Sequence, residues 1–347
     1  MKYSENPFTV IFGVEPKHVI PRMNDFSQIV SVFESTSPRT FAYVITGVRG
    51  CGKTVLMTSV QNYFDEKKDW YVLRLNPDMD LFESAISQLN EVISLPEETV
   101  MDVSVSLAGF GGGVSKRSLS DNDTLLRKMI KKANDNGKKV LIAIDEATNS
   151  ENLKTFAHSY QAYIGEKLKV FLLMTSLPEN FVSLSNSKNG TFLKRLPKIV
   201  LGKLNESMIR NAYSDIFEIS LEEARVLSDI VKGYPFAFQV LGDILWESNK
   251  KSPDDRVLRD FDAILNDCVY TPIWQHLSDN ERRVVFAIAK CKDNSVKEIR
   301  EQLEMQSNEF SPYRDALSAS GIIDTKTYGK VYFTLPRFEE YIKDMNM

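Results

Sequence analysis

Residues 41–57 read FAYVITGVRGCGKTVLM, and this stretch decides the fold. Its first part, Phe41–Ile45, is an apolar run typical of a buried strand. Its centre, Gly47–Thr54, fits G-x-x-x-x-G-K-[ST] at every fixed position. Apolar residues then recur at helical spacing from Val55 to Phe64. A chance glycine turn would not need a strand before it and a helix after it. The stretch therefore predicts a phosphate-binding loop that takes ATP.

The residues of this loop have separate expected roles. Glycines let backbone N–H groups turn inward without Cβ clashes, and a helix N-terminus adds partial positive charge. Lys53 is expected to reach the β- and γ-phosphates, and the Thr54 hydroxyl to hold Mg²⁺. The predicted nucleotide contacts in the loop are Gly47, Val48, Arg49, Gly50, Cys51, Gly52, Lys53, Thr54 and Val55.

A second apolar run, Val140–Ile144, ends in two carboxylates, Asp145 and Glu146. Such a strand end is the expected partner of a phosphate loop. Asp145 is expected to hold Mg²⁺ beside Thr54, and Glu146 to act as the general base that activates water. The alternative is a buried strand followed by an acidic helix cap. Together with the loop, the catalytic interpretation is favoured.

Three further apolar runs complete the predicted sheet. Residues 70–75 are expected to form a second buried strand, which ends at Asn76-Pro77. Val170–Met174 ends in Thr175 and Ser176, whose polar tip either senses the γ-phosphate or is only a turn. Lys198–Leu201 supplies a short fifth strand. Apolar runs that alternate with helices predict a parallel sheet covered on both faces, with ligand at the carboxyl ends of the strands. The expected fold class is an α/β P-loop NTPase core.

The amino-acid composition argues against several classes of function. The chain has 347 residues, 43% hydrophobic and 26% charged, with a net charge of −4. This length predicts two or three domains, and this charge gives no general attraction to nucleic acid or anionic membrane. Three cysteines and three histidines without metal-type spacing argue against a zinc site. Sparse cysteines suit a reducing cytoplasm. The absence of an apolar signal core or a bilayer-length run predicts a cytoplasmic protein that does not use a membrane.

The remaining patterns predict three domains. Residues 1–204 form the ATPase core, and 101–118 are a probable β-hairpin insertion within it. The glycines at 108–113 could instead form a second nucleotide loop, but their spacing fits no dinucleotide fingerprint. Residues 205–275 form a helical lid, with helices over 207–217, 221–231 and 235–246. Residues 276–347 carry helices over 281–289, 296–303 and 311–320 and then a hairpin, which is the winged-helix arrangement.

This order of motifs resembles that of AAA+-related ATPases, and more narrowly that of origin-recognition-like and signal-transduction (STAND) ATPases. The N-terminal Asn6-Pro7-Phe8 and the Gly233-Tyr234-Pro235 element add to the resemblance. It implies a central sheet of strand order 5-1-4-3-2, a C-terminal winged helix and, in many members, nucleotide-controlled assembly.

The resemblance also implies roles for three residues outside the loop. Arg22 corresponds to an arginine that contacts the nucleotide base, although Pro21 replaces the glycine that commonly precedes it. Pro235 corresponds to the proline that approaches the base. Arg195 is, by position, the arginine that completes the γ-phosphate site, with a solvated surface arginine as the alternative. Arg49, inside the loop, is a second candidate for this role, although the direction of its side chain cannot be read from the sequence.

Two functions follow from these patterns. One is an ATPase that uses hydrolysis to drive or time assembly on DNA. The other is a slow nucleotide switch in signalling or defence, whose output is a protein contact. Residues 276–347 hold 11 Lys and Arg against 12 Asp and Glu, so this domain is not basic. If it binds DNA, Arg314, Lys326 and Lys330 must supply most of the phosphate contacts. A protein-docking winged helix remains the rival interpretation.

Overall fold

The computed structural model describes residues 4–11, 16–93, 119–187 and 192–345. The predicted hairpin insertion at 101–118 lies outside these ranges. The chain forms two compact units, one made of Met23–Thr46 and Leu56–Val200, the other of Met1–Arg22, Gly47–Val55 and Leu201–Met347. Among the described helices, none has the length and apolar character needed to cross a bilayer.

A five-stranded sheet forms the centre of the first unit. Its strands are β1 (Ala42–Thr46), β2 (Trp70–Leu75), β3 (Lys139–Ile144), β4 (Val170–Ser176) and β5 (Lys198–Val200). They lie in the order β2-β3-β4-β1-β5, and all neighbours are parallel. This is the predicted order 5-1-4-3-2 read from the other edge, so the prediction is confirmed.

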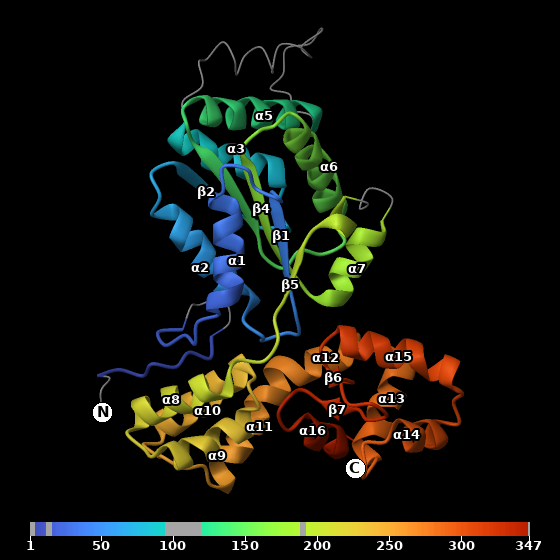
Figure 1. Cartoon of the computed structure of the whole chain (residues 1–347). Coiled ribbons are helices and arrows are strands. Elements are labelled where there is room, and N and C mark those ends of the chain that lie inside the picture. Colours follow the sequence, from blue (N-terminus) through green and yellow to red (C-terminus); the bar gives the residue numbers. More distant parts are fainter. Residues whose placement is uncertain (1–3, 12–15, 94–118, 188–191, 346–347) are drawn as a thin grey trace, which may run out of the picture. The chain divides into compact units, whose positions relative to one another are not determined.

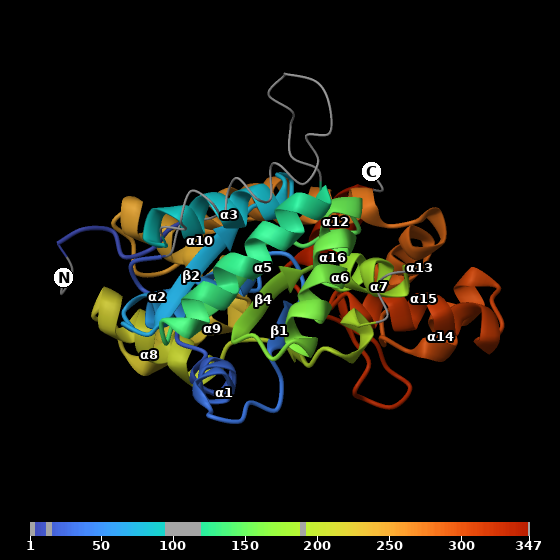
Figure 2. The ribbon, with the colours of Figure 1, turned by 90° about the horizontal axis from the view of Figure 1, so that it is seen from above.

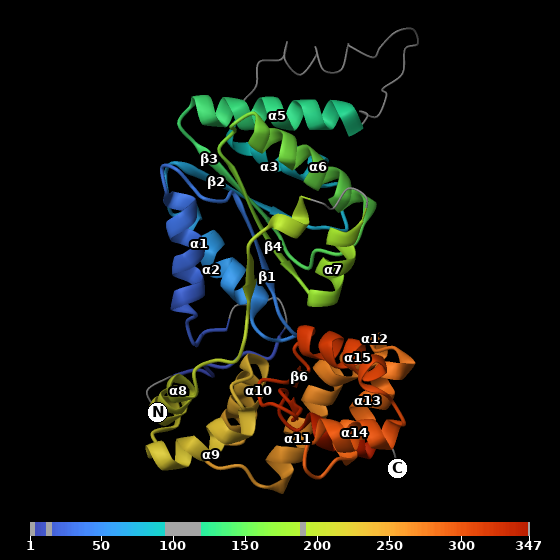
Figure 3. The ribbon, with the colours of Figure 1, turned by 45° about the vertical axis from the view of Figure 1, so that its right-hand side comes forward.

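Helices cover both faces of this sheet (Figures 1 and 3). On one face, Phe33 of α1 (Met23–Glu34) and Phe64 of α2 (Lys53–Asp65) pack together, and Phe33 also packs on Phe171 of β4. The other face is covered by α3 (Leu81–Val92), α5 (Leu119–Asp135), α6 (Glu151–Gly165) and α7 (Pro178–Asn186). Figure 2 shows α3 and α5 side by side over the sheet. Buried strands of this kind need apolar residues on both sides, which explains their continuous apolar runs.

Strand register brings the polar strand ends to one edge. Ile144, the last residue of β3, pairs with Met174, and Ile45 of β1 pairs with Thr175. Asp145 therefore leaves β3 next to Thr175 of β4. Gly47 follows Thr46 in the chain, so the phosphate loop begins at the carboxyl end of β1.

The second unit is helical apart from one hairpin. It contains α8 (Glu206–Phe217), α9 (Leu221–Val231), α10 (Pro235–Glu247), α11 (Asp255–Leu265), a π-helical turn (Asn266–Tyr270), α12 (Thr271–His276), α13 (Asp279–Lys290), α14 (Val296–Leu303), α15 (Ser307–Ala319), β6 (Ile323–Asp324), β7 (Tyr332–Phe333) and α16 (Phe338–Asp344). One cluster of buried apolar side chains runs through these elements. Helix α15 begins at Ser307 rather than at 311, because the Gln306 N–H donates to the Glu309 carboxylate (2.7 Å) and starts the helix earlier. Pro312 consequently lies inside the helix.

The N-terminal segment is tied to α10. The Phe8 ring stacks on Phe217 (5.8 Å between centroids) and meets Phe238 edge-on (5.5 Å). A Cβ on Gly242 would overlap the Phe8 ring, so only glycine leaves room for it. The Thr9 N–H also donates to the Gln239 side-chain oxygen (3.0 Å). These contacts fix the segment that leads toward Arg22.

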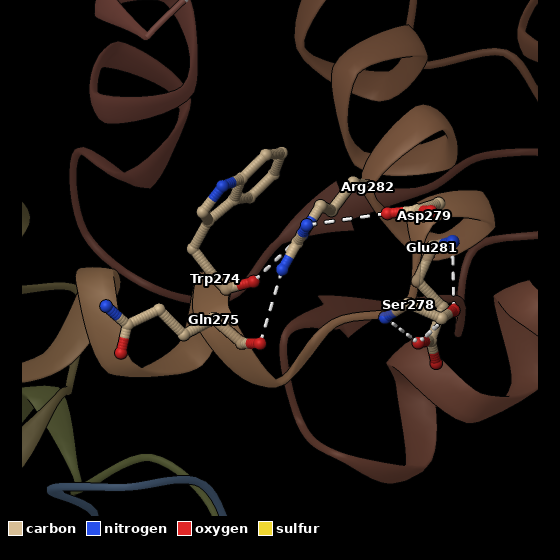
Figure 4. A network of polar contacts seen from close by, with 6 residues as sticks. All are labelled: Trp274, Gln275, Ser278, Asp279, Glu281 and Arg282. Atoms are coloured by element: carbon tan, nitrogen blue, oxygen red, sulfur yellow. Dashed lines mark hydrogen bonds and ion pairs between the residues drawn. The ribbon is translucent and has the colours of Figure 1, made fainter.

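The corner between α12 and α13 is held by Arg282 (Figure 4). Its guanidinium donates to the carbonyl oxygens of Trp274 and Gln275 at the end of α12 (both 3.2 Å) and lies over the Trp274 ring (5.4 Å). Ser278 and Glu281 form a capping box that starts α13. The last carbonyls of α12 and the first turn of α13 are thereby joined in one network.

Candidate nucleotide site

The phosphate loop occupies residues 47–52, between β1 and α2. Its three glycines, Gly47, Gly50 and Gly52, all have positive φ. The Lys53 ammonium, at the first position of α2, donates to the carbonyl oxygens of Gly47 (2.9 Å) and Val48 (3.1 Å). Its side chain thus lies back along the loop, held by neutral acceptors.

Three contacts from distant parts of the chain hold the loop. Arg22 donates through Nη2 to the carbonyl oxygens of Cys51 (3.1 Å) and Gly202 (2.7 Å). The Tyr234 hydroxyl donates to the Arg49 carbonyl oxygen. The Arg49 side chain, in turn, donates through Nε to the Cys268 carbonyl oxygen (3.3 Å) in the π-helical turn. The loop is therefore fixed by Arg22, by Tyr234 just before α10 and by the π-helical turn together.

Sequence reasoning missed the role of Tyr234. This residue is the middle of the Gly233-Tyr234-Pro235 element, and Pro235 begins α10 behind it. A Cβ on Gly50 would collide with the Tyr234 hydroxyl, so the loop glycine and the lid tyrosine fit each other. Burial raises the pKa of Tyr234, so the phenol stays protonated and can donate. No sequence spacing links these two residues.

Asp145, Glu146 and Thr175 form a second cluster, at the tips of β3 and β4. The Glu146 N–H donates to Asp145 Oδ1 (3.1 Å) and to Thr175 Oγ1 (2.9 Å). The Thr175 hydroxyl, which is fully buried, donates to Asp145 Oδ1. The Ala147 N–H donates to the Thr175 carbonyl (2.8 Å) and closes the connection between the two tips. Asp145 is half-buried and Glu146 is exposed.

The backbone of Glu146 is in the left-handed region, with φ 54°. Such a conformation is unfavourable for a residue with a side chain and persists where surrounding contacts hold it. Here the bonds to Asp145 and Thr175 hold it. The N-cap of α6 is Ser150, which accepts from the Leu153 N–H (3.2 Å), so Glu146 is not the cap of that helix.

Thr175 has one hydroxyl proton, and that proton goes to Asp145. A hydroxyl donates one hydrogen bond and accepts others. In this arrangement the Thr175 hydroxyl orients the two carboxyl residues. Arg195, the last residue of a 3₁₀ turn (Leu193–Arg195) before β5, is exposed.

The residues present fit a nucleotide. The loop supplies glycines and an ammonium that suit phosphate oxygens. The Thr54 hydroxyl of the loop and the Asp145 carboxylate of the sheet are each oxygen donors of the kind that Mg²⁺ prefers. Burial raises the pKa of the Cys51 thiol, which keeps this loop residue neutral. A Cβ on Gly47 would lie 2.6 Å from the Cys51 sulfur, so the loop closes tightly on that thiol.

Comparison with known proteins agrees with this description. A family model described as an ATPase domain predominantly from Archaea matches residues 21–219, more than half of the chain. The chain belongs to this ATPase family. A second family model, described as a domain of unknown function, matches residues 267–342. No sequence among the curated proteins matches the chain.

Solved structures confirm the fold of this ATPase family member. A Walker-type ATPase of Pyrococcus abyssi is similar with a TM-score of 0.66 at 12% identity, over 94% of this chain and 96% of that one. The ORC2 protein of Aeropyrum pernix, solved as ADPNP–ADP complexes, is similar with a TM-score of 0.59 at 13% identity, over 97% and 96% of the two chains. The predicted P-loop ATPase is thus confirmed by the family model, which supports a nucleotide-binding ATPase, and the likeness to the ORC2 protein is one of fold.

Proposed function

We propose that this protein binds ATP with Mg²⁺, hydrolyses it slowly, and uses its nucleotide state to control assembly with a partner. The observation that carries hydrolysis is the hydrogen-bonded cluster of Asp145, Glu146 and Thr175. It supplies two carboxylates with different surroundings, one half-buried and one exposed. Family membership and the nucleotide complexes of the ORC2 relative support the same proposal.

In this proposal each residue of the site has a separate role in nucleotide binding or hydrolysis. Lys53 leaves the carbonyl oxygens of Gly47 and Val48 for phosphate oxygens, which are stronger acceptors because they are charged. Thr54 and Asp145 hold Mg²⁺, which neutralises phosphate charge when it is bound. Glu146 accepts a proton from the attacking water, since its carboxylate is exposed beyond the strand tip. Thr175 positions both carboxyl residues.

Arg22 and Pro235 belong to the proposed nucleotide site through the loop. Arg22 donates to the carbonyl oxygen of Cys51 in the loop. Pro235 directly follows Tyr234, whose hydroxyl donates to the carbonyl oxygen of Arg49 in the loop.

For Arg195 we propose a role in hydrolysis, because charge on the γ-phosphate grows toward the transition state. Arg195→Ala should lose most hydrolysis and keep binding. If the arginine acts on a neighbouring subunit, mixing Arg195→Ala with Lys53→Ala protein should restore part of the activity. Full activity in Arg195→Ala alone would remove it from the site.

The nature of the partner is the second part of the proposal. The C-terminal helices and hairpin support the predicted winged helix over 276–347. The other two proposed domains are a lid over 205–275 and a core over 1–204. Arg314 is paired with Asp315, and the Lys330 ammonium donates to the Asp293 carbonyl (2.6 Å). The pairing of Arg314 favours a protein-docking surface over a DNA-binding one, because a carboxylate offsets the charge of one of the three expected phosphate contacts.

The experiment that tests the function measures ATP hydrolysis and molar mass together. Size-exclusion chromatography with light scattering is run with ADP–Mg²⁺, with ATP–Mg²⁺, and with ATP–Mg²⁺ plus duplex DNA. A larger species with ATP alone supports nucleotide-controlled self-assembly. Co-elution with DNA would favour assembly on DNA over the protein switch. A folded protein that neither binds nor hydrolyses ATP would contradict the whole proposal.

A further inference from the structure

The phosphate loop touches the C-terminal region directly, through Arg49 and Val48. Arg49 Nε donates to the Cys268 carbonyl oxygen (3.3 Å), across more than two hundred residues of chain. Val48 Cβ lies 3.5 Å from the place where a Cβ on Gly321 would stand, at the end of α15. Both partners lie within the part matched by the domain of unknown function. Two neighbouring loop residues thus meet the C-terminal region at two points.

Cys268 sits in an element with little freedom to move alone. Residues 266–270 form a π-helical turn, a rare local structure that recurs at functional sites. Two residues after Cys268, the Tyr270 hydroxyl donates to the Pro336 carbonyl, and the Tyr270 ring packs edge-on against Phe338 (5.0 Å). The turn is therefore joined to the chain that enters α16.

The turn is joined to α13 as well. It continues directly into α12, whose last carbonyls are held by Arg282 of α13 (Figure 4). The Trp274 ring packs edge-on against Phe286 of α13 (5.0 Å). A displacement at Cys268 would therefore be passed both to α13 and to α16, because all these contacts are direct.

We propose that Arg49 is a coupling residue, whose guanidinium is shared between the γ-phosphate of bound ATP and the Cys268 carbonyl. This rests on the proposed binding of ATP by the loop. Arg49 lies in the phosphate loop, next to Gly50, and its long side chain extends from the loop to the Cys268 carbonyl oxygen. A guanidinium is attracted more strongly to a charged phosphate oxygen than to a neutral carbonyl oxygen, because the negative charge of the phosphate adds Coulomb attraction to the hydrogen bond. ATP therefore draws Arg49 from the π-helical turn, and ADP, which lacks the γ-phosphate, does so less.

The consequence is a nucleotide signal in the C-terminal region. When Arg49 leaves Cys268, residues 266–276 lose one constraint and their backbone opens more often. Local opening of this kind is measured by amide hydrogen exchange. Loss of one hydrogen bond of ordinary strength predicts exchange about fivefold faster in this segment.

The test is hydrogen–deuterium exchange on the full chain, without nucleotide, with ADP–Mg²⁺, and with a slowly hydrolysed ATP analogue and Mg²⁺. Nucleotide binding is measured separately by calorimetry. In the unmodified protein, exchange over 266–276 should be faster with the ATP analogue than with ADP. In Arg49→Ala it should already be fast without nucleotide and respond to neither ligand. Arg210→Ala is the matched control, since this α8 arginine bonds Ser207 and has no described bond to the loop. It should behave like the unmodified protein.

The outcomes separate this inference from the proposed function. If ATP binds and exchange over 266–276 does not change, or if Arg49→Ala still responds, the coupling is wrong while ATP binding stands. If no nucleotide binds, the proposed function fails. Even then, equal exchange of the unmodified protein and Arg49→Ala without nucleotide would show that the Arg49–Cys268 bond constrains nothing, which overturns the inference by itself.

Discussion

Basic side chains meet different partners in the phosphate loop and on the C-terminal surface. In the loop, Lys53 donates to two neutral backbone carbonyls. On α15, Arg314 makes two hydrogen bonds to one oxygen of the Asp315 carboxylate (3.0 and 2.8 Å). The positive charge in the loop is available to an incoming anion, whereas that of Arg314 is offset by its neighbour.

This difference shows when a basic residue in a sequence predicts an anion-binding site and when it does not. The spacing of the loop motif places Lys53 on a glycine turn at a helix N-terminus, where the backbone itself favours negative charge. Arg314 is supported by no such backbone arrangement. The loop therefore predicts phosphate binding from its motif, while the C-terminal surface must be judged from its actual contacts.

The largest expected effect comes from removing the loop charge. Lys53→Ala should weaken ATP binding by at least about 100-fold, because a hydrogen bond to a charged group contributes about 1.5–3 kcal/mol and Lys53 reaches two phosphates. Calorimetry with ATP–Mg²⁺ measures this loss. Lys131→Ala, an exposed lysine on α5, is the control and should bind normally. Near-normal hydrolysis by folded Lys53→Ala protein would show that ATP does not need the loop charge, and would contradict the contrast drawn between Lys53 and Arg314.

The next effect tests the strand tip. Glu146→Gln should keep ATP binding and slow hydrolysis by about 10²–10⁴-fold, the usual loss for a general base. Steady-state phosphate release and calorimetry separate the two quantities. Glu151→Gln, in the first turn of α6, carries the same change outside the cluster and should be unaffected. Unchanged turnover in Glu146→Gln would leave Glu146 without a catalytic role.

A smaller effect is expected from Thr175→Val. The change keeps the shape but removes the hydroxyl that orients Asp145 and supports the Glu146 backbone. We expect hydrolysis about 10-fold slower, which corresponds to about 1.4 kcal/mol in the barrier. ATP affinity should change less than turnover. Thr175→Ser, which restores a hydroxyl, should recover most activity, and Thr155→Val on α6 should have none of these effects. An equal loss of binding and turnover would indicate a direct phosphate contact instead.

The smallest effect concerns the C-terminal surface. Asp315→Asn releases the Arg314 guanidinium from its carboxylate, so it should make the surface slightly more attractive to DNA. The salt dependence of duplex binding by ATP-loaded protein should steepen by about one unit of slope, the contribution of one added phosphate contact. Asp344→Asn on α16 removes the same charge elsewhere. If neither variant binds DNA at low salt, the protein-docking interpretation is strengthened.

Sequence reasoning predicted what depends on local pattern. Apolar runs located β1, β3 and β4, and the resemblance supplied the order in which they pair. The two carboxyl residues after β3 and the polar tip of β4 were expected at the carboxyl edge, because parallel strands end there together. Apart from the strand order, these predictions required only period and spacing.

Contacts between remote residues were not predictable in the same way. The bond from Tyr234 to Arg49 and that from Arg49 to Cys268 join residues about two hundred positions apart, and no spacing encodes them. The direction of the Arg49 side chain could not be read from the loop motif. The helix predicted over 311–320 begins earlier, at Ser307, because the bond between Gln306 and Glu309 decides its start.

The place of Phe8 against Gly242 bears on how the protein is made. The ribosome synthesises residues 4–11 long before α10. Phe8 therefore cannot pack against α10 until most of the chain has been made. The contacts that hold the phosphate loop also form late, because Tyr234 and Cys268 leave the ribosome late. The sheet unit ends at Val200 and can form earlier. Closing such long stretches of chain is slow. During synthesis the sheet can therefore form before the phosphate loop, which follows β1, gains the contacts that hold it in place.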